Sequence, residues 1–531
     1  MNGPAARLTQ DVSVWMPLSR RRLWADGVKS VPVAVGAVIA LVRVLTGLDW
    51  PAGAVVAACA GATVLVVAAV VGYTAAKLRT TRWRLTPERL ELRSGITVRQ
   101  HRSIPRERVR SVDLRADPVL RVFRLAVAKV GTGEHAGDGT ELVLDGLTRH
   151  EAETLRRTLL LQDAEPAGRD GTLAELRWSW IRYAPLSVWT FTGTALALAG
   201  LYKVLSPLGL KGFAGRMVTD LWDWVTTQPL VAVPLLVVVN IVVGTLGAGL
   251  LFAESWGRYR LEREPGRLRL RRGLLTTRSL TLEERRLRGV EVSEPLLLRL
   301  AGGARVKTIA TGLGKAAEHE TEDVAALTPP LPRALAGRLA ADIAGTHSPA
   351  PGDSTPGDSA PGDSNPAGSM LGESVLLTHP AAARRRRFVR AVVTAAVLAA
   401  GAGTATWLLP WPWRAWVWLA PALALVAGLR LAVSSARSLG HALGERHLIS
   451  RSGALVRRTI ALDRRGISGW TVTESYFQRR SGLLTVSATT AAGKGHYDVV
   501  DVGHGEGLEL AAHAVPGLLE PFLVRQKQRA A

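Results

Sequence analysis

Cysteine and acidic residues are scarce in this chain of 531 residues. Its one cysteine, Cys59, excludes an internal disulfide and a multi-cysteine zinc site. The 44 acidic residues are outnumbered by 67 lysines and arginines, so the formal net charge is +23. Charged residues make up only 21% of the chain and apolar residues 47%. The apolar residues must therefore be concentrated in blocks, which is typical of a membrane protein with basic soluble parts.

Six apolar blocks approach or reach the roughly 20 residues that a helix needs to cross a bilayer. They cover residues 31–48, 51–76, 183–202, 226–253, 391–409 and 415–436, and none contains an Asp or Glu. Short connectors join the first two blocks and the last two. The sequence therefore predicts three transmembrane hairpins, at residues 31–76, 183–253 and 388–436.

Basic residues flank these blocks mainly on one side. Arg20 to Arg22, Lys77 and the run Arg384 to Arg387 adjoin the blocks, whereas the short connectors carry almost no net charge. By the positive-inside rule, both termini and every large segment are expected to be cytoplasmic. Residues 1–30 are polar and do not resemble a cleavable signal peptide, so we expect a multi-pass protein of the cytoplasmic membrane.

A unit of about 180 residues occurs three times. Its clearest markers are the turn glycines Gly95, Gly273 and Gly453. Nine residues after each glycine there is an apolar residue, and twenty-six residues after it there is an arginine: Arg121, Arg299 and Arg479. Equal spacing of the same residue types indicates an internal repeat.

Within each unit, short alternating segments precede a helix. In the first unit we expect strands at 83–85, 90–92, 98–104, 109–114, 125–130 and 141–144. Thr148, with Glu151 three residues later, predicts the start of a closing helix, and similar helices are expected at 331–344 and 505–524. The predicted PH-like domains cover 77–163, 256–345 and 440–526. The Pro-Gly-Asp-Ser-rich linker, 346–378, would let the third hairpin and domain move relative to the others.

This order of elements resembles the bacterial PH-domain membrane proteins of the YdbT type. The resemblance rests on the steps Ile104-Pro105, Leu282-Glu283 and Leu462-Asp463, followed in the first two units by a basic strand at 108–112 and 286–290 and then by the repeated arginine. The third unit departs most, with Trp470 where the others have Val112 and Val290. It implies an α+β membrane protein with three transmembrane helical hairpins, each followed by a cytoplasmic PH-like sheet with a C-terminal helix. It also implies a smaller PH-domain membrane protein as partner and a role in envelope stress or antimicrobial resistance.

Motifs for catalysis are incomplete. His150-Glu151 begins like a zincin helix, but Thr154 stands where the second His is required. Gly314-Lys315 and Gly493-Lys494 lack the Ser or Thr of a phosphate-binding loop. We therefore expect no enzyme activity, no cofactor and no metal, and no nucleic-acid partner, since topology already explains the basic charge.

The sequence favours a non-enzymatic scaffold that presents PH-like domains to proteins or to anionic lipid headgroups at the inner leaflet. Arg121, Arg299 and Arg479 are its candidate membrane- or partner-facing residues, the alternative being arginines that only pack their stems. A transporter or exporter component is the second hypothesis. Pro234 and Asn240 in the fourth apolar block could mark a broken helix, although small and polar residues more often mediate helix packing.

Overall fold

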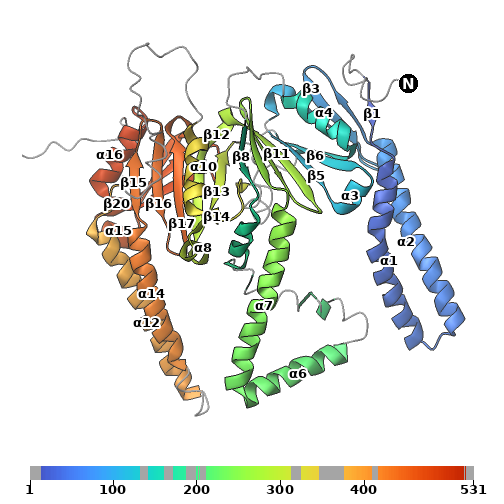
Figure 1. The fold of residues 1–531 in the computed structure, drawn as a ribbon, viewed down its shortest axis with the longest axis horizontal. Coiled ribbons are helices and arrows are strands. Elements are labelled where there is room, and N and C mark those ends of the chain that lie inside the picture. The colour runs from blue at the N-terminus through green and yellow to red at the C-terminus, as the bar shows by residue number, and fades with distance from the viewer. Residues whose placement is uncertain are drawn as a thin grey trace, which may run out of the picture. The chain divides into compact units, whose positions relative to one another are not determined.

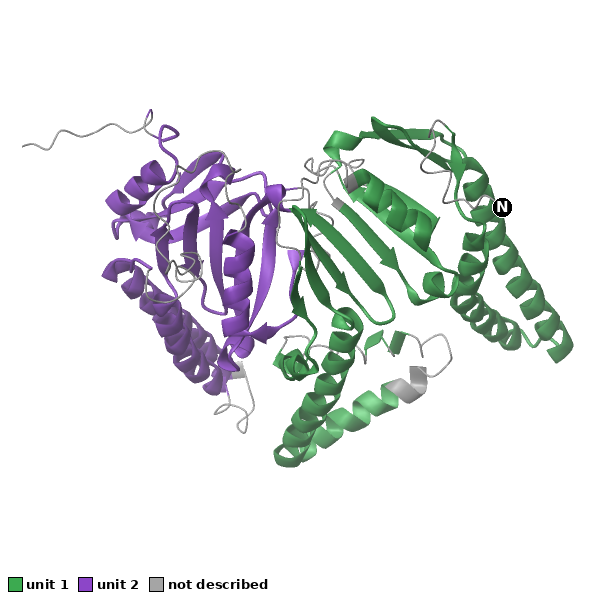
Figure 2. Cartoon of the chain, turned by 45° about the horizontal axis from the view of Figure 1, so that its top comes forward, with its two compact units in different colours: residues 1–283 green, residues 284–531 purple. Residues whose placement is uncertain are grey.

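The computed structural model describes residues 14–109, 111–131, 141–160, 171–186, 190, 199–200, 202–203, 211–311, 325–345, 376–408, 417–519 and 521. The chain forms two compact units, residues 1–283 and residues 284–531 (Figure 2). The boundary falls between two strands of the predicted second domain, so each unit holds parts of two repeats.

Within the described residues, five helices are long and apolar enough to cross a membrane: α1 (Arg21–Gly47), α2 (Ala52–Thr80), α7 (Pro229–Trp256), α12 (Ala381–Leu408) and α14 (Leu419–Arg437). At most 17% of the apolar window of each helix is buried. In Figure 1, α1 lies along α2, and α12 along α14. Large apolar surfaces that no protein element covers are typical of helices solvated by lipid.

The region of the third predicted span differs from the expectation. Most of 183–202 lies outside the described residues. Its start, however, belongs to a 3₁₀ helix, η4 (Trp178–Leu186), which contains Pro185. Helix α6 (Lys211–Thr227) lies mostly between the third and fourth predicted blocks, and in it charged residues alternate with Met, Val, Leu and Trp. Such a mixed helix suits a membrane interface better than a bilayer core.

Unit 1 begins with a four-stranded sheet in the order β1 (Met16–Pro17), β2 (Arg82–Leu85), β3 (Arg89–Ser94) and β4 (Gln100–Pro105). This sheet packs against the second half of the same repeat, namely β5 (Ser111–Ala116), β6 (Leu125–Gly131), β7 (Glu141–Thr148) and helix α4 (Arg149–Leu160). The core between them includes Trp83, Leu90, Leu142 and Leu155. The alternating apolar residues of the sequence thus form one buried layer, as period-two strands require.

The predicted capping box of α4 is confirmed. The backbone N–H of Thr148 donates to Glu151 Oε2 at 2.8 Å, and the N–H of Glu151 donates to Thr148 Oγ1 at 3.3 Å. The predicted third closing helix, in contrast, ends early. Helix α16 (His504–Ala514) stops before Pro516, because the residue preceding a proline is displaced from helical geometry.

Strands from consecutive repeats join edge to edge in unit 1. Its larger sheet has seven strands in the order β7-β6-β5-β11-β10-β9-β8. The strands β9 (Arg260–Glu264), β10 (Arg267–Arg272) and β11 (Thr277–Glu283) belong to the second repeat, and β8 (Gly171–Glu175) precedes them. The antiparallel pairing of β5 with β11 is the joint between repeats one and two.

Unit 2 contains the equivalent joint between repeats two and three. Its six-stranded sheet joins β12 (Leu287–Pro295), β13 (Gly303–Ala310) and β14 (Leu331–Pro332) to β15 (Gly440–Leu443), β16 (His447–Ser452) and β17 (Val456–Asp463). Helix α10 (Arg333–Gly345) covers β12 and β13. Because β12 pairs with β17, the linker does not separate the third repeat from the second. The linker itself lies almost wholly outside the described residues.

The third repeat ends in a three-stranded sheet, β18 (Gly469–Thr473), β19 (Leu483–Thr489) and β20 (His496–Gly503). An aspartate on the last strand ties the sheet to its own helical hairpin. Asp501 on β20 pairs with Arg387 of α12 at 3.2 Å. In the first repeat Asp145 on β7 pairs in the same way with Arg22 of α1 at 2.7 Å. These buried or half-buried ion pairs fix the base of the α1–α2 hairpin and of the α12–α14 hairpin to a sheet.

Candidate anion-binding pocket

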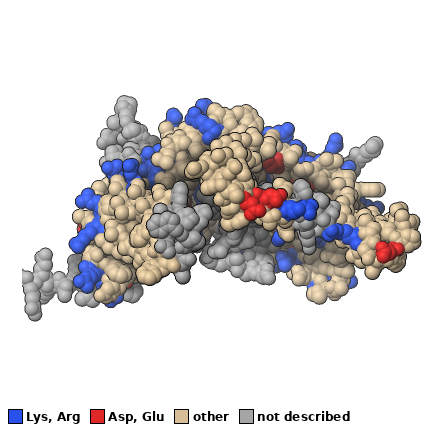
Figure 3. All heavy atoms as spheres, turned by 90° about the horizontal axis from the view of Figure 1, so that it is seen from below, with Lys and Arg blue, Asp and Glu red and all other residues tan. Residues whose placement is uncertain are grey.

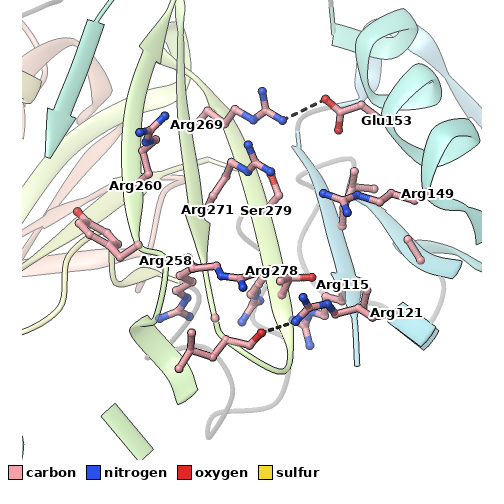
Figure 4. Close-up of a pocket in the computed structure, with 18 of the residues that line it drawn as sticks. Arg115, Arg121, Arg149, Glu153, Arg258, Arg260, Arg269, Arg271, Arg278 and Ser279 are labelled. Atoms are coloured by element: carbon pink, nitrogen blue, oxygen red, sulfur yellow. Dashed lines mark hydrogen bonds and ion pairs between the residues drawn. The ribbon is translucent and has the colours of Figure 1, made fainter. Parts of the chain in front are cut away.

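A cavity of about 900 Å³ lies in unit 1 over the joint between β5 and β11. Its walls come from β5, the start of α4, the strands β9 to β11 and the turn that links α7 to β9. No single repeat could form this cavity, because residues of the first and second repeats face each other across it (Figure 4).

The walls are strongly basic. Two glutamates, Glu153 and Glu175, face ten arginines: Arg115, Arg121, Arg124, Arg149, Arg258, Arg260, Arg269, Arg271, Arg272 and Arg278. Arginines that lie close together repel one another, so such a cavity favours a bound anion.

Part of this charge is neutralised within the protein. Arg269 bonds Glu153 at 3.0 Å, Arg260 bonds Glu175 at 2.6 Å, and Arg278 bonds Asp113 at 3.0 Å. Burial raises the pKa of Glu153, but hydrogen bonding from Arg156 and nearby guanidinium charges outweigh it, so the pKa lies below its usual value. Glu153 is therefore an anion that orders one wall of the pocket.

Four arginines of the pocket are free to bind a ligand. Within the described residues, no side-chain ion pair or hydrogen bond engages the guanidinium of Arg124, Arg149, Arg258 or Arg271. Partial burial, followed by repulsion from Arg269, lowers the pKa of Arg271. Figure 4 shows Arg149, Arg258 and Arg271 facing the same space from three different elements. Guanidinium groups converging in this way match the oxygens of a phosphate.

One end of the pocket lies at the end of the apolar helix α7. Arg258 and Tyr259 follow this helix directly, and the Arg272 guanidinium stacks over Trp256, its last residue, at 4.4 Å. Trp178 on η4 is 54% exposed beside them. Tryptophan and arginine at the end of an apolar helix are typical of the headgroup region of a membrane. Seen from the side of the apolar helices, the surface shows many more basic than acidic residues (Figure 3).

The three repeated arginines lie at equivalent places but in different surroundings. Arg121, in helix α3 (Pro118–Val122), donates to the carbonyls of Leu274 and, at 2.9 Å, Leu275. Arg299, in α8 (Leu296–Leu300), donates to Ser434 Oγ at 2.8 Å and to the Ala454 carbonyl at 3.3 Å. Arg479, in α15 (Tyr476–Arg479), is exposed. Only Arg121 lines the pocket, so the structure does not bring the three together in one site.

The turn glycines occupy the backbone conformation that a side chain disfavours. Gly95, Gly273 and Gly453 have φ values of 123°, 104° and 111°. A Cβ at Gly273 would lie 1.8 Å from the Thr276 carbonyl oxygen. Each therefore permits the tight turn that precedes β4, β11 or β17.

The free arginines of the pocket are not among the residues that the sequence repeat marks. A signal was present in β10, where Arg267, Arg269 and Arg271 occupy alternate positions and so lie on one face of a strand. Two of the incomplete motifs have structural roles instead, and the third, Gly314-Lys315, lies outside the described residues. His150 lies in the capped first turn of α4, and Gly493 adopts a turn with φ 59°. Within the described residues, no three metal-ligating side chains cluster.

A family model for the bacterial PH domain matches the chain three times, at residues 31–163, 210–343 and 386–514. These matches cover most of the sequence, so the chain belongs to the bacterial PH domain family and contains three of its repeats. Each match includes apolar helical sequence as well as a sheet, which defines the repeating unit as helices followed by a PH-like domain. No match was found among curated proteins or solved structures.

Proposed function

We propose that this protein is a non-enzymatic scaffold, anchored in the cytoplasmic membrane, that binds the phosphate of anionic phospholipid headgroups in the pocket over the β5–β11 joint. The observation that supports this most is the convergence of Arg149, Arg258 and Arg271 in a pocket that reaches the end of α7. Among the described residues, no side-chain hydrogen bond or ion pair engages these three guanidinium groups. A phospholipid in the membrane leaflet that surrounds this end of α7 would place its phosphate at the level of the pocket.

The expected affinity follows from simple electrostatics. A basic residue near an anionic membrane surface contributes about 1 kcal/mol, and this contribution falls within a Debye length. Two free arginines therefore account for about 2 kcal/mol, or roughly a 30-fold preference for an anionic over a zwitterionic lipid. Salt should reduce this preference, because the pocket is accessible to solvent.

The test is native mass spectrometry of the full chain titrated with phosphatidylglycerol or phosphatidylcholine. The double variant Arg149→Ala/Arg271→Ala should lose about 30-fold in affinity for phosphatidylglycerol and little for phosphatidylcholine. The matched control is Arg285→Ala/Arg465→Ala, which removes two exposed arginines outside the pocket. If both double variants lose affinity equally, binding is non-specific and the proposal is wrong.

The orientation in the membrane has a separate test. Protease-sensitive tags at residue 1, in the linker and at residue 531 should be protected in intact, wall-stripped cells and be cleaved after lysis. A tag near Gly212 should be cleaved in intact cells. Cleavage of the linker tag before lysis would contradict the proposed orientation, and with it the access of the pocket to the inner leaflet.

A further inference from the structure

The two joints between repeats share one register. In the first joint Val112 lies opposite Thr281, and in the second Val290 lies opposite Ala461. Val112 and Val290 each lie 17 positions after the turn glycine of their own repeat. Thr281 and Ala461 each lie 8 positions after the turn glycine of the following repeat, so the two joints have the same register. A one-residue slip would reverse the faces of every side chain, so equal register in two joints indicates one specific interface that occurs twice.

Ion pairs across the two joints occupy equivalent positions. Asp113 on β5 pairs with Arg278 on β11 at 3.0 Å, and Glu291 on β12 pairs with Arg458 on β17 at 3.5 Å. The second joint has one more pair, between Glu294 and Arg457. Opposite charges on adjacent strands stabilise the correct pairing and its register.

The repeated arginine closes each joint. Arg121 of the first repeat binds the carbonyls just after the turn glycine of the second, Gly273. Arg299 of the second repeat binds the carbonyl just after the turn glycine of the third, Gly453. Each arginine therefore recognises the exposed peptide groups of the next repeat's turn, a contact that needs no particular side chain there.

Two strands lack this pairing in the described part of the chain, β4 of the first repeat and β18 of the third. Among the described residues, the sheets end at these two strands. All residues of β12 are buried or half-buried within its joint, whereas the equivalent β18 exposes Thr471, Val472 and Thr473. Exposed strand edges of this kind pair readily with another chain.

The two free edges are complementary in the shared register. Applied to β18 and β4, that register places Trp470 opposite the small Ser103 and Thr473 opposite Gln100. It also places Glu474 opposite Arg99, as Glu294 lies opposite Arg457 in the second joint. Arg479 would then reach the carbonyl of Ile96, the residue just after the turn glycine Gly95.

We propose that a second copy of this chain occupies each free edge, β18 of one copy pairing antiparallel with β4 of the next. The contact is head to tail, so it generates a ring if the rotation between copies closes and a filament if it does not. It is compatible with one membrane, because α1, α2 and α7 project from the same side of unit 1 across the first joint (Figure 1). Arg479 is thus a partner-binding residue.

The test is disulfide cross-linking of the full chain in native membranes, in a Cys59→Ser background. The double variant Gln100→Cys/Thr473→Cys should give a ladder of oligomers on mild oxidation, and each single variant should give none. The control pair Ser103→Cys/Thr473→Cys is out of register by three residues, about 10 Å along the strand, and should cross-link poorly. Adding Arg479→Ala to the in-register pair should lower the yield several-fold, whereas Arg480→Ala should not.

Several outcomes would overturn the proposal. A disulfide within one chain would mean that β4 and β18 pair intramolecularly. Cross-linking to a different protein, or equal yields from the in-register and out-of-register pairs, would also exclude a specific joint between copies. If the in-register pair still gives the full yield of oligomers when Arg479→Ala is added, Arg479 does not bind the neighbouring copy. Lipid binding in the pocket is measured separately, so failure here leaves the proposed function intact.

Discussion

Removal of the Arg121 side chain should loosen the first joint without unfolding unit 1. Arg121 makes two hydrogen bonds to carbonyls of the turn before β11. Hydrogen bonds from a charged donor contribute about 1.5 to 3 kcal/mol, and partial exposure of Arg121 favours the lower end of this range. We therefore expect Arg121→Ala to destabilise the β5–β11 pairing by about 2 kcal/mol.

Hydrogen–deuterium exchange of the full chain in nanodiscs measures this effect locally. A loss of about 2 kcal/mol should accelerate exchange of the β5 and β11 amides about 30-fold, with little change in β2 and β3. Arg479→Ala is the matched control, because it removes the equivalent arginine of the third repeat, which lies outside the β5–β11 joint. In this variant the protection of β5 and β11 should change by no more than about 0.5 kcal/mol. Unchanged protection of β5 and β11 in Arg121→Ala would refute the role of this arginine in the joint.

Three further perturbations have defined outcomes. Gly273→Ala should lower the melting temperature, because its φ of 104° and the Thr276 carbonyl exclude a Cβ; Gly337→Ala, in open space within α10, should raise it slightly. Thr148→Ala should cost about 1 kcal/mol of stability in chemical denaturation, through loss of the α4 cap. Burial, and next to it repulsion from nearby His441, lowers the pKa of His379 to about 4. Between pH 6.5 and pH 4 the unfolded chain therefore binds a proton at His379 that the native state does not bind. Stability should therefore fall by up to about 3 kcal/mol as the pH decreases from 6.5 to 4, and His379→Gln should flatten this dependence in pH-resolved melting curves.

Local sequence patterns predicted the local structure well. The alternating residues around Leu90 and Val112 are buried in strands, Thr148 and Glu151 form the expected cap, and the turn glycines have positive φ. These features depend on neighbours a few residues away, so they can be read from the sequence.

The joints and the pocket could not be predicted in this way. Pairing of β5 with β11 joins backbone groups of residues some 165 positions apart in the sequence. Every residue carries these backbone groups, so the choice of partner strand produces no pattern of residue types in the sequence. The equal spacing of Arg121, Arg299 and Arg479 indicated a shared role, but their targets lie in the following repeat. The free arginines of the pocket converge only after the joint has formed, so their grouping follows from tertiary structure.

The central claim is that the pocket over the first joint holds a lipid phosphate. An electron cryo-microscopy reconstruction of the full chain in phosphatidylglycerol nanodiscs tests it most directly. We predict density for a phosphate between Arg149, Arg258 and Arg271, continuous with acyl chains beside α7. A pocket without such density, in a map that resolves these three side chains and shows lipid elsewhere on the helices, would contradict the account.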